Sequence, residues 1–267
     1  MMARRFVSLN IRRFILAGAV ALIVSFLAFP AMSAESIDPE ADKILKSMSD
    51  YLGGLSMFSM NADIDNEIVD LAGQKLQLSS GASIIIERPG NLYMHRHGAY
   101  ADVEFLFNGK VLTLYGKGMN AYMQVSSPGN TDKAFNTMQN EIGLDAPGAD
   151  LLLANPYPSL SDGVTSSTYL GTAYVNGIEC HYLTFRAAQV DWQLWVQTGK
   201  TPLPMKYIIT TKWVTGAPQY SIRFRDWNTK PQIEADQFAF TVPEGAIKLE
   251  TLPVNEVGEL MIEEDQK

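Results

Sequence analysis

The chain has 267 residues, of which 46% are hydrophobic and 19% charged, and its formal charge at pH 7 is −8. An acidic chain repels nucleic acid and anionic membrane surfaces, so this charge argues against both as binding partners. Cys180 is the one cysteine, so no internal disulfide can form, and we expect its thiol to be a small buried side chain on a strand.

The N-terminus has the pattern of a secretory signal peptide. Four arginines precede an apolar run from Phe14 to Phe29, and the small residues of PAMSA follow it. The run is shorter than the ~20 apolar residues that a spanning helix needs, although an uncleaved N-terminal anchor is the alternative. We expect cleavage near Ser33 or Ala34 and export to the periplasm. Loss of the four arginines would change the formal charge from −8 to −12.

The next segments predict a helix followed by a run of strands. Asp38 can cap a helix that starts at Pro39, and apolar residues recur at helical spacing as far as Gly53-Gly54. From Phe58 the apolar period changes to two, as expected of strands. The predicted strands are 58–68, 75–87, 91–98, 102–108, 111–116 and 120–125. Tight-turn signals such as Asn108-Gly109 favour antiparallel pairing of neighbours.

The middle of the chain returns to helical spacing. Residues 131–143 predict one helix, and DAPGADLLLANP (145–156) predicts a second, capped by Asp145 and ended by Asn155-Pro156. A polar loop is expected at 159–167. Strands resume after it, and the acidic residues from about Leu252 lack the apolar groups that predict order. The predicted later strands are 167–175, 178–186, 191–198, 204–214, 219–227 and 238–246.

This order of elements predicts an α+β protein that is mainly β, with one antiparallel sheet and its helices gathered on one face. Three regions are expected along the chain. They are a signal peptide at 1–34, a single domain at 35–250 and an acidic tail at 251–267.

Motifs of nucleotide-binding and hydrolytic enzymes are absent from the sequence, which has no GxSxG, P-loop, HExxH or CxxC pattern. His95 and His97, in LYMHRHG, would share one strand face. A zinc site needs a third ligand, and His181 is the one remaining histidine. A solvated strand face is the favoured interpretation, a pH-sensitive contact is an alternative, and a metal-dependent hydrolase is the least favoured function. No metal or other cofactor is expected.

Three acidic residues, Asp63, Asp65 and Glu67, also share one strand face. Calcium ligands wrap around the ion, and a straight strand does not provide such a loop. A solvated face is again the favoured interpretation. Negative charge on this strand would also suit the edge of a sheet, where it discourages pairing with another chain.

Rows of apolar residues leave two alternatives for the interior. Sheet and helices could bury one another in a filled core, or a curled sheet could leave an apolar cavity, for which methionine-rich walls are suited. The residues expected to line such a cavity are Leu45, Met48, Leu52, Met60, Ile64, Leu78, Ile84, Ile86, Met94, Phe105, Phe107, Phe135, Met138, Leu152, Trp192, Leu194, Met205, Tyr207, Ile209, Trp213, Ile222 and Phe224.

Seven segments resemble a family of predicted periplasmic proteins of unknown function. The segments read, in order, ERPGNLYMHRHG, FNGKVLTLYG, DAPGADLLLANP, VNGIECHYLTFR, DWQLWVQTGKTPLPMKYIIT, YSIRFRDW and FAFTVPEGA, and the resemblance as a whole covers about 41–249. The pattern WxxxGxxPLP at 195–204 and the closing FxFxxPxGA are the most specific parts. That family is similar to the bacterial outer-membrane lipoprotein carriers, which are LolA-like and include relatives of the LppX and RseB types.

The resemblance implies an unclosed antiparallel β half-barrel whose concave apolar face is covered by helices, with the segments after Thr131 as a lid. It implies a non-enzymatic periplasmic binding or carrier protein for a hydrophobic ligand, such as a lipid or a lipoprotein acyl chain. Arg88 is the nearest match to the lid-gating arginine of the carriers. The alternative is an envelope sensor or interaction module of the same fold, with an envelope protein as its partner.

Overall fold

The computed structural model describes residues 36–100, 102–144 and 146–251. The helical elements are α1 (Pro39–Gly53), α2 (Thr131–Asn140), the 3₁₀ helix η1 (Ala149–Leu152) and α3 (Pro156–Ser161). The strands are β1 (Met57–Val69), β2 (Lys75–Glu87), β3 (Asn91–Gly98), β4 (Asp102–Asn108), β5 (Val111–Gly116), β6 (Ala121–Ser126), β7 (Val164–Val175), β8 (Ile178–Ala187), β9 (Val190–Gln197), β10 (Pro204–Thr211), β11 (Gln219–Asn228) and β12 (Ile247–Lys248). Within these ranges no helix is long and apolar enough to cross a membrane. The predicted signal peptide, the Asp145 cap and the acidic tail beyond Thr251 lie outside the described residues.

The strands form one open sheet in the order β12-β6-β5-β4-β3-β2-β1-β11-β10-β9-β8-β7. Strands β1 to β6 pair in chain order, and so do β7 to β11, while β11 pairs with β1 and joins the two runs. All these pairs are antiparallel, and the short β12 adds to β6 in parallel. The sheet does not close, because β12 and β7 are its two edges. The predicted fold class, a mainly β protein with an unclosed antiparallel sheet, is confirmed.

Helix α1 begins and ends where the sequence predicts. The Asp38 carboxylate accepts hydrogen bonds from the backbone N–H groups of Glu40 and Ala41, at 2.9 and 3.3 Å, and Pro39 opens the first turn. The apolar stripe of the helix, which includes Leu45 and Leu52, is buried. Gly53 allows a close approach at the other end, because a Cβ there would lie 2.6 Å from the Ala154 carbonyl oxygen.

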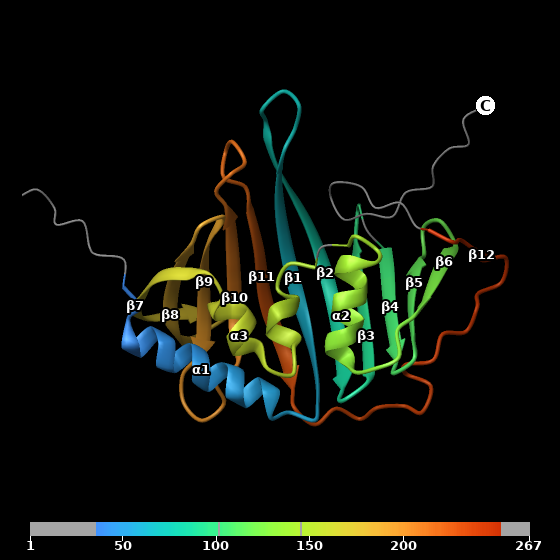
Figure 1. Ribbon diagram of the computed structural model, residues 1–267, viewed down its shortest axis with the longest axis horizontal. Coiled ribbons are helices and arrows are strands. Elements are labelled where there is room, and N and C mark those ends of the chain that lie inside the picture. The colour runs from blue at the N-terminus through green and yellow to red at the C-terminus, as the bar shows by residue number, and fades with distance from the viewer. Residues whose placement is uncertain (1–35, 101, 145, 252–267) are drawn as a thin grey trace, which may run out of the picture. The chain divides into compact units, whose positions relative to one another are not determined.

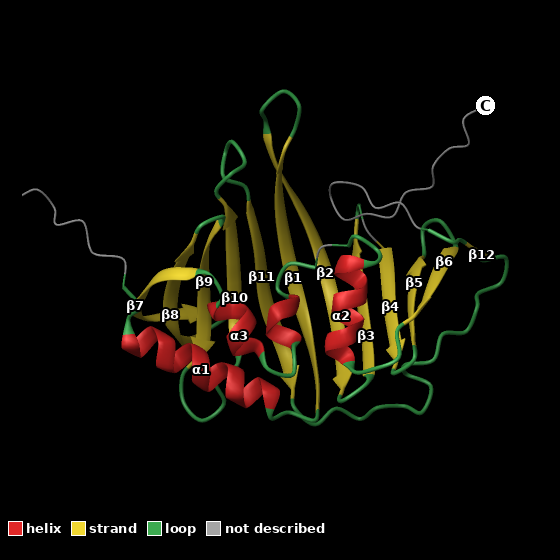
Figure 2. Cartoon of the chain, in the orientation of Figure 1, coloured by secondary structure: helices red, strands yellow, loops and turns green. Residues whose placement is uncertain are grey.

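Strand register divides the side chains between two faces of the sheet. One apolar row runs across five strands, with Met60 opposite Ile84, Ile84 opposite Met94, Met94 opposite Phe105, and Phe105 opposite Leu114. The helices lie over this face, which we call the inner face (Figures 1 and 2). The opposite, outer face of the central strands carries the polar residues of the alternating pattern.

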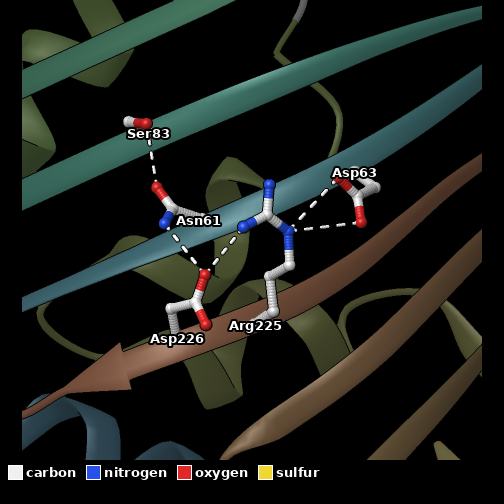
Figure 3. A network of polar contacts seen from close by, with 5 residues as sticks. All are labelled: Asn61, Asp63, Ser83, Arg225 and Asp226. Atoms are coloured by element: carbon white, nitrogen blue, oxygen red, sulfur yellow. Dashed lines mark hydrogen bonds and ion pairs between the residues drawn. The ribbon is translucent and has the colours of Figure 1, made fainter. Parts of the chain in front are cut away.

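A polar network joins three central strands on the outer face (Figure 3). The Asn61 amide donates to Asp226 at 3.0 Å and its oxygen accepts from Ser83 at 2.8 Å. Arg225 pairs with Asp63 at 3.3 Å and with Asp226 at 2.7 Å. These contacts span β11, β1 and β2, and so support the pairing that unites the two strand runs.

The acidic strand β1 is central rather than at an edge, so that prediction is wrong. Strand β11 pairs with β1, and the Asp65 and Glu67 carboxylates contact residues of the neighbouring strands. Asp65 accepts a hydrogen bond from Ser79 at 2.6 Å. Glu67 pairs with Lys75 at 3.1 Å and accepts from the backbone N–H of Gln219 at 2.9 Å.

The predicted strand at 238–246 is also wrong. The two-residue strand β12 follows that segment, and the phenylalanines pack by side chains rather than by backbone pairing. Phe238 is buried, and the Phe240 ring centroid lies 5.1 Å from that of Tyr122 and 5.7 Å from that of Tyr115. Alternating aromatic residues that dock on a sheet face have the same period as a strand, which explains the error.

Several element boundaries differ from prediction. Helix α2 ends at Asn140 rather than at 143, and the end of α3 and the start of β7 occupy most of the expected polar loop at 159–167. Pro156 opens helix α3 at its first turn instead of ending the preceding helix, and the expected second helix is only the 3₁₀ turn η1. Strand β10 ends at Thr211, so Trp213 falls in the following turn and is 72% exposed.

Candidate functional site

A cavity lies between the inner face of the sheet and the connection from α2 to α3. Strands β1, β2, β3, β4 and β11 form its floor, while Met138 of α2 and residues of the following segment cover it. We call residues 141–153, of which 145 is not described, the lid segment. The centre of a water-sized sphere can move through about 110 Å³ inside the cavity. Its lining consists chiefly of apolar side chains. This cavity corresponds to the second of the two alternatives for the interior, in which a curled sheet leaves an apolar hollow.

Small side chains explain why the interior is hollow at this place. Ala62 and Ala82 lie directly opposite each other on β1 and β2, where larger side chains would fill the floor. The lid segment contributes small residues above them, including Gly148 and Ala149. Gly148 has a positive φ of 88°, and a Cβ there would lie 2.6 Å from Ile222 Cδ1. The lid backbone can therefore approach the sheet without side chains that would occupy the cavity.

The structure brings together nine of the residues expected to line a cavity. They come from both strand runs and from the lid, namely Met60, Ile64, Ile84, Met94, Phe105, Met138, Leu152, Ile222 and Phe224. Another group is buried in the packed core and does not line this cavity, namely Leu45, Met48, Leu52, Ile86, Phe107, Trp192, Leu194, Met205 and Tyr207. The interior is thus filled in part and hollow in part, which combines the two alternatives.

The remaining candidates lie outside this cavity. Phe135 is buried and lines a neighbouring hollow beside the lid segment. Leu78 and Ile209 are half-buried on the sheet, and Trp213 projects into solvent. Trp213 does not line the cavity because strand β10 ends two residues before it.

Several lining residues were not predicted, and most are small. Ala62, Ala82 and Ala149 interrupt the apolar rows, and a search for large hydrophobic residues passes over them. A signal was present, because a turn centred near Ala72 places Ala62 opposite Ala82 in a hairpin. Arg96 and Tyr220 also line the cavity, and the period-two spacing puts each on the same strand face as a predicted lining residue, Met94 and Ile222 respectively.

Arg88 connects the lid segment to the body of the protein. Its Nη2 donates to the carbonyl oxygens of Leu152 and Leu153, both at 3.0 Å, and its Nε donates to the Leu55 carbonyl at 3.2 Å. The guanidinium carbon lies 5.7 Å from the Phe58 ring centroid. One arginine therefore holds the end of the lid segment to the loop between α1 and β1.

The environment of Arg88 leaves its hydrogen-bonding capacity incompletely used. Its Nη1 is buried and has no hydrogen-bond partner among the residues that the structure describes. Burial lowers the pKa of the guanidinium, and the nearby Asp132 carboxylate opposes that change. Asp132 itself accepts a hydrogen bond from the Ala154 backbone N–H at 2.9 Å. Arg88 thus holds the last two residues of the lid segment, and Asp132 at the start of α2 holds Ala154, which directly follows them.

The histidines do not converge on one site. His95 and His97 lie on the outer face with ring centroids 5.1 Å apart, and His95 Nε2 lies 2.8 Å from Asp102. The His97 ring covers Gly81, where a Cβ would come within 2.7 Å of it. His181 lies with Tyr169 on β8 and β7, with Nδ1 3.1 Å from the tyrosine hydroxyl. No group of three potential metal ligands exists among the described residues.

Comparisons with solved structures find similar chains at low identity. LprF from Mycobacterium bovis is 16% identical, with 79% of this chain and 99% of that chain covered and a TM-score of 0.44. LppX from Mycobacterium tuberculosis is 13% identical, with 74% and 100% covered and a TM-score of 0.43. A LolA superfamily protein from Nitrosomonas europaea is 10% identical, with 75% and 97% covered and a TM-score of 0.40. A comparison with curated proteins finds no match.

A family profile covers most of the domain described above. The family described as "Predicted periplasmic protein (DUF2092)" matches residues 41–252, a range that runs from α1 through the open sheet and the lid to the end of the described chain. This match confirms the family resemblance inferred from the seven sequence segments. The chain belongs to DUF2092, a family of predicted periplasmic proteins.

Proposed function

We propose that the protein binds and carries a hydrophobic ligand, such as a lipid or a lipoprotein acyl chain, in the periplasm. The observation that carries this proposal is the apolar cavity whose floor and lid both use small residues. Exposure of an acyl chain to water costs about 0.8 kcal/mol of free energy for each CH₂ group. The chain therefore needs a covered apolar site to cross an aqueous compartment.

The size of the cavity requires the lid segment to move for a long ligand. A water-sized group needs roughly 10–15 Å³ measured in this way, so about 110 Å³ accommodates roughly eight such groups. A sixteen-carbon chain exceeds that space. Binding a chain of this length therefore displaces the lid segment, and the cavity described here is the closed form of the site.

Arg88 is suited to act as the gate of this movement. Its bonds to Leu55, Leu152 and Leu153 are made to backbone carbonyls, which can be exchanged for water when the lid segment lifts. Because the guanidinium stays charged at any physiological pH, the gate responds to the occupant of the cavity rather than to proton concentration. The residue assigned by resemblance thus has contacts that fit the role.

The proposal is tested by uptake of a neutral apolar fluorophore, N-phenyl-1-naphthylamine, by the purified mature protein. Ala82→Leu adds three carbons to the cavity floor and should weaken uptake at least about tenfold. Ala72→Leu makes the same change in the exposed β1–β2 turn and should leave uptake unchanged. Equal thermal unfolding midpoints for the two variants would separate cavity filling from loss of fold.

Absence of uptake by the unmodified protein would overturn the proposal. Affinity purification from envelope extracts addresses the alternative function. A stoichiometric envelope protein recovered without lipid would favour an interaction module of the same fold over a carrier.

A further inference from the structure

One charged side chain lines the apolar cavity from the middle of the sheet. Arg96 lies on the inner face of β3, directly opposite Ala82 on β2 and Val103 on β4. Its Nε donates a hydrogen bond to the Ser80 hydroxyl at 3.1 Å. This bond leaves the two terminal nitrogens of the guanidinium available to other acceptors.

A second polar group lies near Arg96 at the cavity wall. Tyr220 of β11 is packed so that burial raises the pKa of its hydroxyl, and the positive charge of Arg96 opposes that increase. Both residues line the same cavity, Arg96 from β3 and Tyr220 from β11. A guanidinium and a phenol therefore line a site whose other walls are mostly apolar, and the Ser80 hydroxyl accepts a hydrogen bond from that guanidinium.

The charge of Arg96 is not balanced by an ion pair among the described residues, in contrast to the charges of Arg225 and Arg186. Arg225 on the outer face pairs with both Asp63 and Asp226, and Arg186 pairs with Asp191. No described carboxylate lies within ion-pair distance of Arg96. A half-buried cation against apolar walls favours an anion as its partner.

Strand register places these polar groups at one end of the cavity. Arg96 lies in the row of Ala62, Ser80 lies opposite Ile64, and Tyr220 lies opposite Asn66. From Ala62 to Asn66 these rows follow β1 toward the β1–β2 turn. The row of Met60, at the other end, is entirely apolar across the neighbouring strands. The cavity thus has a polar end and an apolar end.

We propose that the cavity takes an anionic amphiphile, with its carboxylate or phosphate head paired to Arg96 and Ser80 and its acyl chain against the Met60 row. This inference rests on the proposed binding function and specifies its ligand class. A neutral lipid would gain the apolar contacts but not the charge-assisted hydrogen bonds, so the site discriminates between ligands by their heads.

The test compares three amphiphiles of equal chain length as competitors of bound N-phenyl-1-naphthylamine at pH 8. Dodecanoate and dodecyl phosphate should displace the fluorophore at about tenfold lower concentration than 1-dodecanol does. In Arg96→Gln this advantage should fall to about twofold or less, while the affinity for dodecanol stays unchanged. Arg96→Lys keeps the charge and should retain most of the advantage.

Arg223→Gln is the matched control. It removes the same charge from strand β11 of the same sheet, but Arg223 is exposed and lies opposite Asp63 on the outer face, so the advantage should remain tenfold. Inorganic phosphate alone should not reduce the dodecyl phosphate advantage at millimolar concentration. If it does so, the site takes a free anion and the proposed amphiphile is wrong.

Two other outcomes separate the proposals. Equal displacement by all three amphiphiles in the unmodified protein would overturn the anionic ligand and leave hydrophobic binding intact. Lack of any fluorophore uptake would overturn the proposed function itself. An equal loss of advantage in Arg96→Lys and Arg223→Gln would also contradict the role of Arg96.

Discussion

At the scale of single residues, the smallest side chains decide where the interior is hollow. Ala62 faces Ala82 across β1 and β2, while the adjacent row places Met60 opposite Ile84. The alternation of the sequence predicts which face each of these residues occupies. It does not by itself reveal a cavity, since an alanine in an apolar row reads equally well as part of a filled core.

The Cys180 thiol gives a prediction at the same scale. Burial raises its pKa to about 11, and reagents such as iodoacetamide attack the thiolate. At pH 8 the native protein should therefore be alkylated at least about 100-fold more slowly than the urea-unfolded chain, whose thiol has a pKa of about 8.5. The folded state also holds this proton more tightly, so its contribution to stability is complete below about pH 8.5 and is lost as pH rises toward 11. Rapid alkylation of native protein at pH 8 would contradict the burial of this residue.

At the scale of elements, the lid depends on contacts that local sequence does not encode. The spacing predicts a helix over 131–143, and the helix forms over 131–140, where Asn130 caps it through a 3.0 Å bond from the Lys133 N–H. The next segment is shorter in helix than predicted, because Gly148 takes a left-handed backbone conformation and Pro156 opens a new helix. Its path over the sheet is fixed instead by Arg88, which is more than fifty residues away in sequence.

Arg88→Met should loosen the lid segment selectively. The variant loses the donors to three carbonyls, and hydrogen bonds to charged groups contribute a net stability of roughly 1.5–3 kcal/mol each. Amide hydrogen exchange in residues 146–153 should accelerate at least about tenfold, and bound fluorophore should dissociate faster. Arg186→Met, a surface variant whose side chain is 65% exposed, should change neither rate. Unchanged exchange in the lid of Arg88→Met would remove the gate from the proposed mechanism.

At the scale of the whole described domain, the sheet depends on one long-range pairing. Turn signals predict the hairpins within each run of strands, and these pairs are observed. The pairing of β1 with β11 joins Ile64 to Ile222 across almost the whole domain, and no turn specifies it. That is why a central strand was mistaken for an edge. The same pairing brings Phe224 opposite Ala62 and Ile222 opposite Ile64, and so creates a cavity floor that no single hairpin contains.

The central claim is that this hollow holds an alkyl chain. Native mass spectrometry of the protein purified from the periplasm of its own host tests it most directly. The account predicts a bound species of acyl-chain mass on the unmodified protein, released on denaturation, and its loss from Ala82→Leu with retention in Ala72→Leu. An unmodified protein that carries no such mass, and acquires none after incubation with lipid, would contradict it.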